Sequence, residues 1–213
     1  MTLLDQMKET GIVAVIRGAS EENIIPIANA LKNGGVIALE ITLETPGALS
    51  AIEKLAAELG DEVIAGAGTV LDPETARAAI MAGARFVFAP TVNIETIKLT
   101  KRYGVLSIPG ALTPTEILTA YVNGADLIKV FPAHAFGPKY LKDIHGPLPQ
   151  IPLMPTGGVN LENLGDFVRA GAVAAGIGSN LVNTKREINE EYLAQLEQTA
   201  RAYSQAFKEA KRQ

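Results

Sequence analysis

Lys129 is a basic residue inside a short apolar run, residues 126–132, that has the composition of a buried β-strand. Burial disfavours the charged form of lysine and can lower its pKa by several units, and the neutral amine is the form that attacks a carbonyl to make a Schiff base. The run therefore predicts a lysine nucleophile. A second interpretation is open for this residue taken alone, because Lys129 could lie on an edge strand, or lay its stem along apolar surface and keep its charge in water.

A carboxylate occupies the same kind of setting at Glu40, inside the apolar run of residues 38–42. It suits Schiff-base chemistry, because a carboxylate can move protons, directly or through one water, while a carbinolamine dehydrates and a C–C bond breaks. The alternative is a buried ion pair between Glu40 and Lys129 without a catalytic role, although such pairs seldom recover the free energy lost on desolvation. We therefore predict that Glu40 is the acid/base partner of Lys129.

Two glycine turns follow the last two strand-like runs of the chain. Thr156, Gly157 and Gly158 lead into one helical segment, and Gly178 and Ser179 lead into another short segment. Backbone N–H groups at such positions bind phosphate, and glycine lets the backbone approach the anion closely. Either turn alone could be an ordinary tight turn. Together they predict a phosphorylated substrate.

Three more residues come after strand-like runs, where a substrate would bind. Arg17 follows the first run and is free to hold a substrate carboxylate in its guanidinium fork, with a structural salt bridge as the alternative. Thr69 and Pro90 follow the third and fourth runs. With two histidines and no cysteine, the chain lacks a convincing metal cluster, so we expect neither a metal nor another cofactor.

Eight strand-like runs position these residues, at 12–16, 37–41, 63–65, 86–88, 105–108, 127–131, 151–154 and 173–177. Segments with helical periodicity lie between them, and many end with glycine. Their expected starts carry capping side chains, among them Thr45, Asp72, Asn93, Thr113 and Asn160. This alternation predicts an α/β protein of one domain, residues 1–213, built as a (β/α)₈ TIM barrel over about residues 11–182. Because the second and sixth strands of such a barrel are opposite each other, Glu40 and Lys129 could face each other across its mouth.

A doubly wound open sheet is the alternative architecture, but the first strand is not followed by the Gly-x-Gly-x-x-Gly of a dinucleotide fold. After residue 182 the pattern changes to one charged helix, about 187–211, with apolar positions at helical spacing. We expect this additional helix to pack on the outside of the barrel, and a subunit contact is its other possible use.

The composition argues against nucleic acid and membranes as partners. The formal net charge of −4 leaves no basic footprint, and five Tyr and six Phe offer little stacking surface, so nucleic acid is not an expected partner. No stretch is long and apolar enough to predict a membrane span. The first residues lack the features of a secretory signal, and we therefore expect a cytoplasmic protein.

The sequence resembles the 2-keto-3-deoxy-6-phosphogluconate aldolase and 4-hydroxy-2-oxoglutarate aldolase family over residues 11–182. Six motifs in order carry the resemblance: Val-Ala-Val-Ile-Arg at 13–17, Leu-Glu-Ile-Thr-Leu at 39–43, Gly-Ala-Gly-Thr-Val at 66–70, Pro-Gly at 109–110, Ile-Lys-Val-Phe-Pro-Ala at 128–133 and Pro-Thr-Gly-Gly-Val at 155–159. The resemblance implies a (β/α)₈ fold, a homotrimer, and metal-free cleavage of the phosphorylated keto acid to pyruvate and glyceraldehyde 3-phosphate, as in the Entner-Doudoroff pathway.

The resemblance also implies roles for individual residues. It makes Lys129 the Schiff-base amine and Glu40 the general acid/base. The substrate contacts that it implies are Thr69 and Pro90 on the pyruvate side, Phe131 beside the imine, Thr156 in the substrate channel, and Gly157, Gly158 and Ser179 at the phosphate.

The chain departs from the pattern of this family at one position. The resemblance implies that some members carry an arginine four residues after the catalytic glutamate, where this chain has Glu44. The carboxylate of pyruvate would then be held by Arg17 and Thr69. Cleavage of 4-hydroxy-2-oxoglutarate is the alternative activity, and a barrel that binds a phosphorylated metabolite or serves as an assembly subunit without catalysis is the alternative class.

Overall fold

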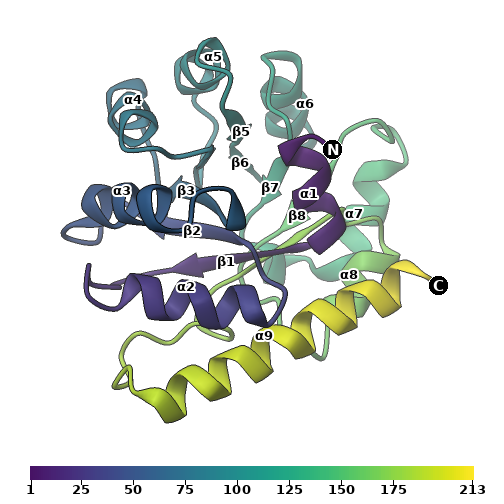
Figure 1. The fold of residues 1–213 in the computed structure, drawn as a ribbon. Coiled ribbons are helices and arrows are strands. Elements are labelled where there is room, and N and C mark those ends of the chain that lie inside the picture. Colours follow the sequence, from purple (N-terminus) through teal and green to yellow (C-terminus); the bar gives the residue numbers. More distant parts are fainter.

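The computed structural model describes residues 1–213 as parallel strands that alternate along the chain with helices (Figure 1). The strands are β1 (Ile12–Ile16), β2 (Ala38–Thr42), β3 (Ile64–Gly68), β4 (Phe86–Phe88), β5 (Leu106–Ile108), β6 (Gly110–Ala111), β7 (Ile128–Val130), β8 (Leu153–Pro155) and β9 (Ala175–Ile177). The helices are α1 (Leu3–Thr10), α2 (Ile24–Asn33), α3 (Ala48–Glu58), α4 (Pro73–Met81), α5 (Ile94–Arg102), α6 (Pro114–Val122), α7 (Gly137–His145), α8 (Leu164–Arg169) and α9 (Glu190–Lys211), with short 3₁₀ turns at Gly60–Glu62 and Ala133–Ala135. The predicted α/β class is confirmed.

The strands form two parallel sheets. The six-stranded sheet has the order β5-β4-β3-β2-β1-β9, and the three-stranded sheet has the order β6-β7-β8. All eight predicted strand runs overlap a strand, and the fifth run is followed after Pro109 by the extra strand β6. Proline has no N–H to donate to a ladder, which accounts for the division into β5 and β6. Isolated parallel bridges join Leu153 to Ala172 and Thr156 to Gly176, so the segments of β8 and β9 also lie side by side.

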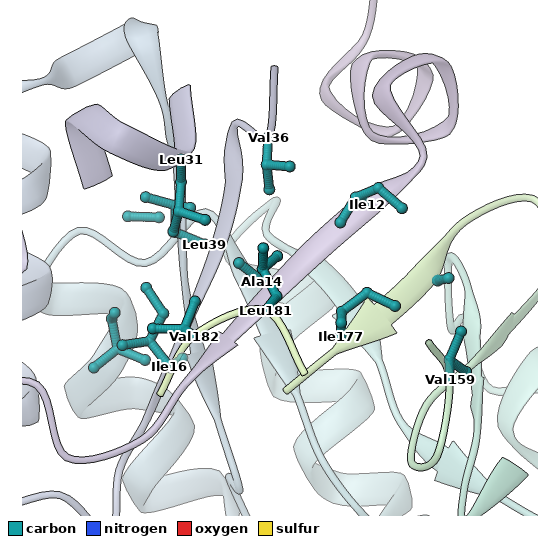
Figure 2. Packing of buried hydrophobic residues seen from close by; sticks show 14 of the residues in the cluster. Ile12, Ala14, Ile16, Leu31, Val36, Leu39, Val159, Ile177, Leu181 and Val182 are labelled. Atoms are coloured by element: carbon teal, nitrogen blue, oxygen red, sulfur yellow. The ribbon is translucent and has the colours of Figure 1, made fainter. Parts of the chain in front are cut away.

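Alternate residues of each strand point to opposite faces of the sheets, as the two-residue period of a strand requires. One face packs against the helices and includes the buried residues Ile12, Ala14, Ile16, Leu39 and Ile177 (Figure 2). The other face, called here the inner face, forms with Met7 of α1 a second cluster of buried apolar side chains: Val13, Val15, Ala38, Ile64, Phe86, Phe88, Ile108, Leu127, Met154 and Ala174. The same period assigns Glu40 and Lys129 to the inner face, because their neighbours along the strand face the helices.

Local capping explains where several helices begin. Asp72, Asn93 and Thr113 each accept a hydrogen bond from a backbone N–H in the first turn of the helix that follows, as expected for N-caps. Thr113 and Glu116 form the reciprocal bonds of a capping box. These three starts agree with the capping pattern of the sequence.

Other helix starts lie later than the sequence pattern suggests. The helix after Thr45 begins at Ala48, because the Thr45 hydroxyl accepts the N–H of Gly18 in a neighbouring loop and does not cap a helix. The helix after Asn160 begins at Leu164, since the Asn160 side chain is engaged by the N–H groups of Glu162 and Asn163 in a preceding turn.

Helix α9 begins at Glu190, where Asn189 is its N-cap, and packs against α2 and α8 on the outside of the fold (Figure 1). This agrees with the predicted additional helix. The sequence patterns did not single out α1 or α7. No helix of the protein has the length and apolar character needed to cross a membrane.

Candidate active site

Lys129 is the central residue of β7, the middle strand of its sheet, and is only 4% exposed. Its Nζ lies 4.1 Å from the ring centroid of Phe88 and 4.8 Å from that of Phe131. The amine makes no hydrogen bond or ion pair within the chain. Burial lowers the pKa of Lys129, and the negative charge of Glu40 opposes that shift. The alternative of a lysine on an edge strand with its charge in water is therefore wrong.

Glu40 is the central residue of β2 and is 1% exposed. Burial raises its pKa to about 7, against the opposing effect of the positive charge of Lys129. Its Oε2 is fully buried and has no hydrogen-bond partner. The two groups affect each other's protonation, but they form no ion pair. The alternative of a buried structural ion pair is not what the structure contains.

Gly68 on the neighbouring strand β3 leaves space for the Glu40 carboxylate because it has no side chain. A side chain at Gly68 would overlap the carboxyl group, so glycine is required there for steric reasons. Gly66, two residues earlier on the same face, is similarly covered by the ring of Phe86. The motif of residues 66–70 thus shapes the space around the carboxylate, a role that its sequence alone does not indicate.

Phe88 is a site residue that the sequence reasoning missed. It lies on β4, is fully buried, and packs edge-on against Phe86 with ring centroids 6.4 Å apart. An aromatic face attracts a nearby cation, which partly offsets the effect of burial on the Lys129 ammonium. The alternation of aromatic residues at 86 and 88 was the available signal, since it predicts that both rings share the inner face.

Arg17 and Thr69 lie at the ends of β1 and β3, near the buried pair. The Arg17 side chain is 64% exposed, and its Nη1 is 3.9 Å from Oε2 of Glu44. Such an exposed pair contributes little to stability. The structural salt bridge considered for Arg17 is therefore present, and it leaves the guanidinium accessible to solvent. Thr69 has a φ of 56°, a left-handed conformation that is rare for a β-branched residue.

The two glycine turns carry free backbone donors. Gly157 and Gly158 have φ values of 88° and 79°, which glycine adopts without strain. The backbone N–H groups of Gly157, Gly158, Gly178 and Ser179 have no acceptor within the chain. A row of unpaired N–H groups is a favourable environment for an anion.

Thr156 lies at the base of these turns, where its backbone forms the isolated bridge with Gly176. The Thr156 side chain is buried, and its Oγ1 has no hydrogen-bond partner. A side chain at Gly176 would collide with that hydroxyl. The structure therefore brings Thr156 and both glycine turns together, as the predicted phosphate site requires.

Pro90 lines a cavity of about 630 Å³. Phe131 lines the same cavity, and most of its wall comes from the first turns of α5 and α6 and the loops before them. Neither Glu40 nor Lys129 lines it, so this cavity is adjacent to the buried pair and does not contain it. No group of three or more His, Asp or Glu side chains is placed to hold a metal ion.

An α/β fold with parallel strands, a buried amine and a buried carboxylate of raised pKa defines an enzyme of the Schiff-base class. Comparison with known families identifies which one. The family model described as KDPG and KHG aldolase matches residues 3–199, and the chain belongs to this family. It is a class I aldolase, a carbon–carbon lyase.

Individual relatives agree with this membership. The chain is 40% identical over 206 residues to a 2-dehydro-3-deoxy-phosphogluconate aldolase from Pseudomonas aeruginosa, covering 96% of this chain and 93% of the relative. It is 34% identical over 200 residues to a 2-dehydro-3-deoxy-6-phosphogalactonate aldolase from Escherichia coli, with coverages of 93% and 95%. Among solved structures, the KDPG aldolase of Legionella pneumophila, with pyruvate captured as a covalent carbinolamine, has a TM-score of 0.87 at 30% identity and covers 95% of this chain and 98% of its own.

Proposed function

We propose that this enzyme cleaves 2-keto-3-deoxy-6-phosphogluconate to pyruvate and glyceraldehyde 3-phosphate through a Schiff base on Lys129. The observation that carries the proposal is the state of the Lys129 amine, which is buried, unpaired and lowered in pKa. An amine with these properties is neutral more often than an exposed lysine and is available to attack a ketone. The likeness to the Pseudomonas aeruginosa relative, named for the same substrate, supports the choice of substrate.

The mechanism follows from the positions of Lys129 and Glu40. The Lys129 amine adds to the C2 ketone, and the carbinolamine loses water to give the imine, with Glu40 moving the protons. The Glu40 carboxylate then takes the proton of the C4 hydroxyl, and the C3–C4 bond breaks. Its electron pair moves into the imine to form an enamine, while glyceraldehyde 3-phosphate leaves. Protonation of the enamine at C3 and hydrolysis of the imine release pyruvate and restore the amine.

The remaining site residues are proposed to bind the two ends of the substrate. Arg17 and Thr69 hold the carboxylate of the pyruvate half, and Pro90 and Phe131 pack beside it. Thr156 lines the channel between the two ends of the substrate. The phosphate is bound by Gly157, Gly158, Gly178 and Ser179, whose unpaired N–H groups support this assignment.

We also propose that the two sheets close into one eight-stranded (β/α)₈ barrel forming a single domain. The bridge between Thr156 and Gly176 at one seam supports closure, as does the single proline between β5 and β6 at the other. The homotrimer stays a prediction that light scattering would test. The cytoplasmic location and the exclusion of nucleic acid likewise stay predictions.

The central test is chemical trapping of the imine. Borohydride added with pyruvate should reduce the imine and leave a stable mass increase on the peptide that contains Lys129. The same treatment without pyruvate is the control. If pyruvate is released from substrate but no adduct forms on Lys129, the proposed chemistry is wrong.

A second substrate is favoured by one of the comparisons, since the Escherichia coli relative is named for the phosphogalactonate epimer. Coupling pyruvate release to lactate dehydrogenase would rank the gluconate and galactonate substrates and unphosphorylated 4-hydroxy-2-oxoglutarate. A higher kcat/KM for the phosphogluconate substrate is the expected result. The opposite order would replace the proposed substrate and leave the imine chemistry intact.

A further inference from the structure

We propose that Asn180 is a positioning residue that joins the two glycine turns and keeps their N–H groups at a fixed separation. The first turn comprises residues 156–160 and the second comprises residues 178–182. The inference rests on the proposed function, in which these turns bind the phosphate of the substrate. Asn180 itself has no role in the chemistry.

The central observation is one hydrogen bond between the turns. Nδ2 of Asn180 donates to the backbone oxygen of Val159 at 3.0 Å, across 21 residues of sequence. No other side-chain hydrogen bond connects the two turns. The backbone bridge between Thr156 and Gly176 joins the segments at their base. The turns are therefore joined at two points, and Asn180 provides the one at the exposed end.

Buried apolar residues anchor each turn from below. Val159 in the first turn and Leu181 in the second are 2% and 5% exposed and belong to the same core cluster (Figure 2). Val159 is itself the acceptor of the Asn180 bond, and Leu181 directly follows Asn180. The core thus fixes the apolar side of each turn, whereas Asn180 ties the polar sides to each other.

A second asparagine determines how the first turn is oriented. Nδ2 of Asn163 donates to the oxygen of Gly158 at 2.9 Å, and its Oδ1 accepts the N–H of Asn160 at 2.9 Å. In a trans peptide the C=O and N–H point in opposite directions, so holding the Gly158 oxygen also orients the N–H of Val159. That N–H has no acceptor in the chain. The two asparagine side chains thus occupy the carbonyl oxygens of Gly158 and Val159, while the N–H groups of Gly157, Gly158 and Val159 stay unpaired.

The effect of the Asn180 bond should be preorganisation. Glycine turns lose more conformational freedom on ordering than other segments, and a site that orders on binding loses affinity for that reason. A bond that holds the turns before substrate arrives removes part of this cost. It acts on the phosphate end of the substrate and leaves the imine end unchanged, which makes the two roles separable by experiment.

The test compares Asn180→Ala with Asn183→Ala in the same loop. The Asn183 side chain bonds only to the N–H of Lys185, two residues away, so its loss should leave the turns joined. For Asn180→Ala we expect KM for the phosphorylated substrate to rise about three- to tenfold, the range for one lost hydrogen bond. The kcat for this substrate, kcat/KM for unphosphorylated 4-hydroxy-2-oxoglutarate and borohydride trapping with pyruvate should stay unchanged. Asn180→Asp, which keeps the shape but removes the amide donor, should shift KM in the same direction.

Each outcome decides the inference. If Asn180→Ala lowers kcat/KM equally for the phosphorylated and the unphosphorylated substrate, Asn180 has a merely structural role and the inference is wrong. An unchanged KM for the phosphorylated substrate would also overturn the inference. Ser179→Ala distinguishes a failure of this inference from a failure of the proposed function. It removes the Ser179 hydroxyl at the proposed phosphate site and leaves the Asn180–Val159 hydrogen bond in place. If Ser179→Ala raises KM and Asn180→Ala does not, only the role of Asn180 is wrong. If the wild-type enzyme does not favour the phosphorylated substrate, the proposed substrate and the role of Asn180 are both wrong, while the imine chemistry stands or falls with the borohydride test.

Discussion

Two lysines with opposite environments contact or belong to the segment that contains β7, Lys101 at its N-terminal end and Lys129 within the strand. Lys101 on α5 places its Nζ 2.7 Å from both oxygens of Asp126, just before the strand, and Asp126 also accepts the N–H of Ser107 at 2.8 Å. Lys129, three residues further along, has two aromatic rings near its amine and no acceptor. Both residues are lysines, so the groups around each amine, and not the residue type, determine its role.

The difference between these lysines follows the polarity of the parallel strands. At the N-terminal end, the carboxylate of Asp126 satisfies an ammonium and connects a helix to the sheet. Further toward the C-terminal end, Lys129 is withdrawn from water, and it forms no ion pair with Glu40, the carboxylate with the largest electrostatic effect on its pKa. In parallel barrels the first end serves stability and the second serves chemistry. Substitutions at the two ends should therefore affect different properties.

Lys129→Met tests the chemical end and should have the largest effect. The rate of pyruvate release should fall more than about 10³-fold, because the nucleophile is gone. Stability should not fall, since the substitution removes a buried amine whose protonation the folded state disfavours. Coupled assays and thermal unfolding measure the two quantities. Loss of folding in this variant would contradict the contrast between the two lysines.

Glu40→Gln tests the second member of the buried pair. We expect kcat to fall about 10²- to 10⁴-fold, the usual contribution of a general acid/base. Borohydride trapping with pyruvate should persist at a lower rate, because the amine remains. Trapping followed by mass spectrometry and steady-state assays separate these effects. A variant with full activity would remove Glu40 from the mechanism.

The raised pKa of Glu40 also predicts a dependence of stability on pH. Its pKa is about 7 in the folded protein and 4.5 ordinarily, so its destabilising effect is absent below pH 4.5 and grows as the pH rises to about 7. The shift corresponds to on the order of 3 kcal/mol of unfolding free energy. Urea unfolding at pH 5 and at pH 8 should show that the free energy of unfolding falls more between these two pH values for wild type than for Glu40→Gln.

Activity should respond in the opposite direction to pH. The C4 hydroxyl proton is taken by the ionised carboxylate, so kcat/KM should rise as the pH increases through about 7, the pKa of Glu40. Glu40→Gln should lack this rise. Identical pH profiles for the two proteins would assign the ionisation to another group.

Lys101→Met tests the structural end of the comparison. It leaves the Asp126 carboxylate, 19% exposed, without its cation. We expect a loss of about 2 kcal/mol in unfolding free energy, below the range for a fully buried pair because both groups keep some contact with water. The kcat/KM of the folded enzyme should match wild type. A large fall in kcat/KM with unchanged stability would reverse the assignment of the two ends.

Glu44 is an exposed residue near the buried Lys129 and Glu40. Its substitution, Glu44→Gln, should have the smallest effect. It removes the charge that pairs with Arg17 at 3.9 Å and leaves the guanidinium free for a substrate carboxylate. KM for the substrate should fall about two- to threefold, with stability within about 0.5 kcal/mol of wild type. Glu58→Gln, which loses a comparable exposed pair with Lys54, is the matched control and should leave KM unchanged. A rise in KM would mean that Glu44 contacts substrate directly.

Much of the site could be predicted because it depends on local patterns. The two-residue period of a strand points Lys129 away from the face that carries Ile128 and Val130. A charged residue inside an apolar run therefore indicates a functional position. The glycine turns were found in the same way, from residue types next to strand ends. The start of α6 was also local, since Thr113 and its capping partner are three residues apart.

Other features could not be predicted because they join segments that are distant in sequence. The ring of Phe88 reaches Lys129 across the inner face, and Gly68 is adjacent to Glu40 only through strand pairing. Thr45 was expected to start a helix, but its hydroxyl is held by Gly18 from another loop. Each case depends on which strands and loops become neighbours when the sheets pack.

The sequence by itself determined the types of chemistry available to this protein: an amine and a carboxylate within apolar strands, and glycine turns able to bind an anion. These follow from interactions between residues close together in the chain. Only the tertiary structure decided that Lys129 and Glu40 influence each other without forming an ion pair, and that Asn180 joins the two turns. Distances of this kind are set by the packing of whole helices and strands, which no short stretch of sequence encodes.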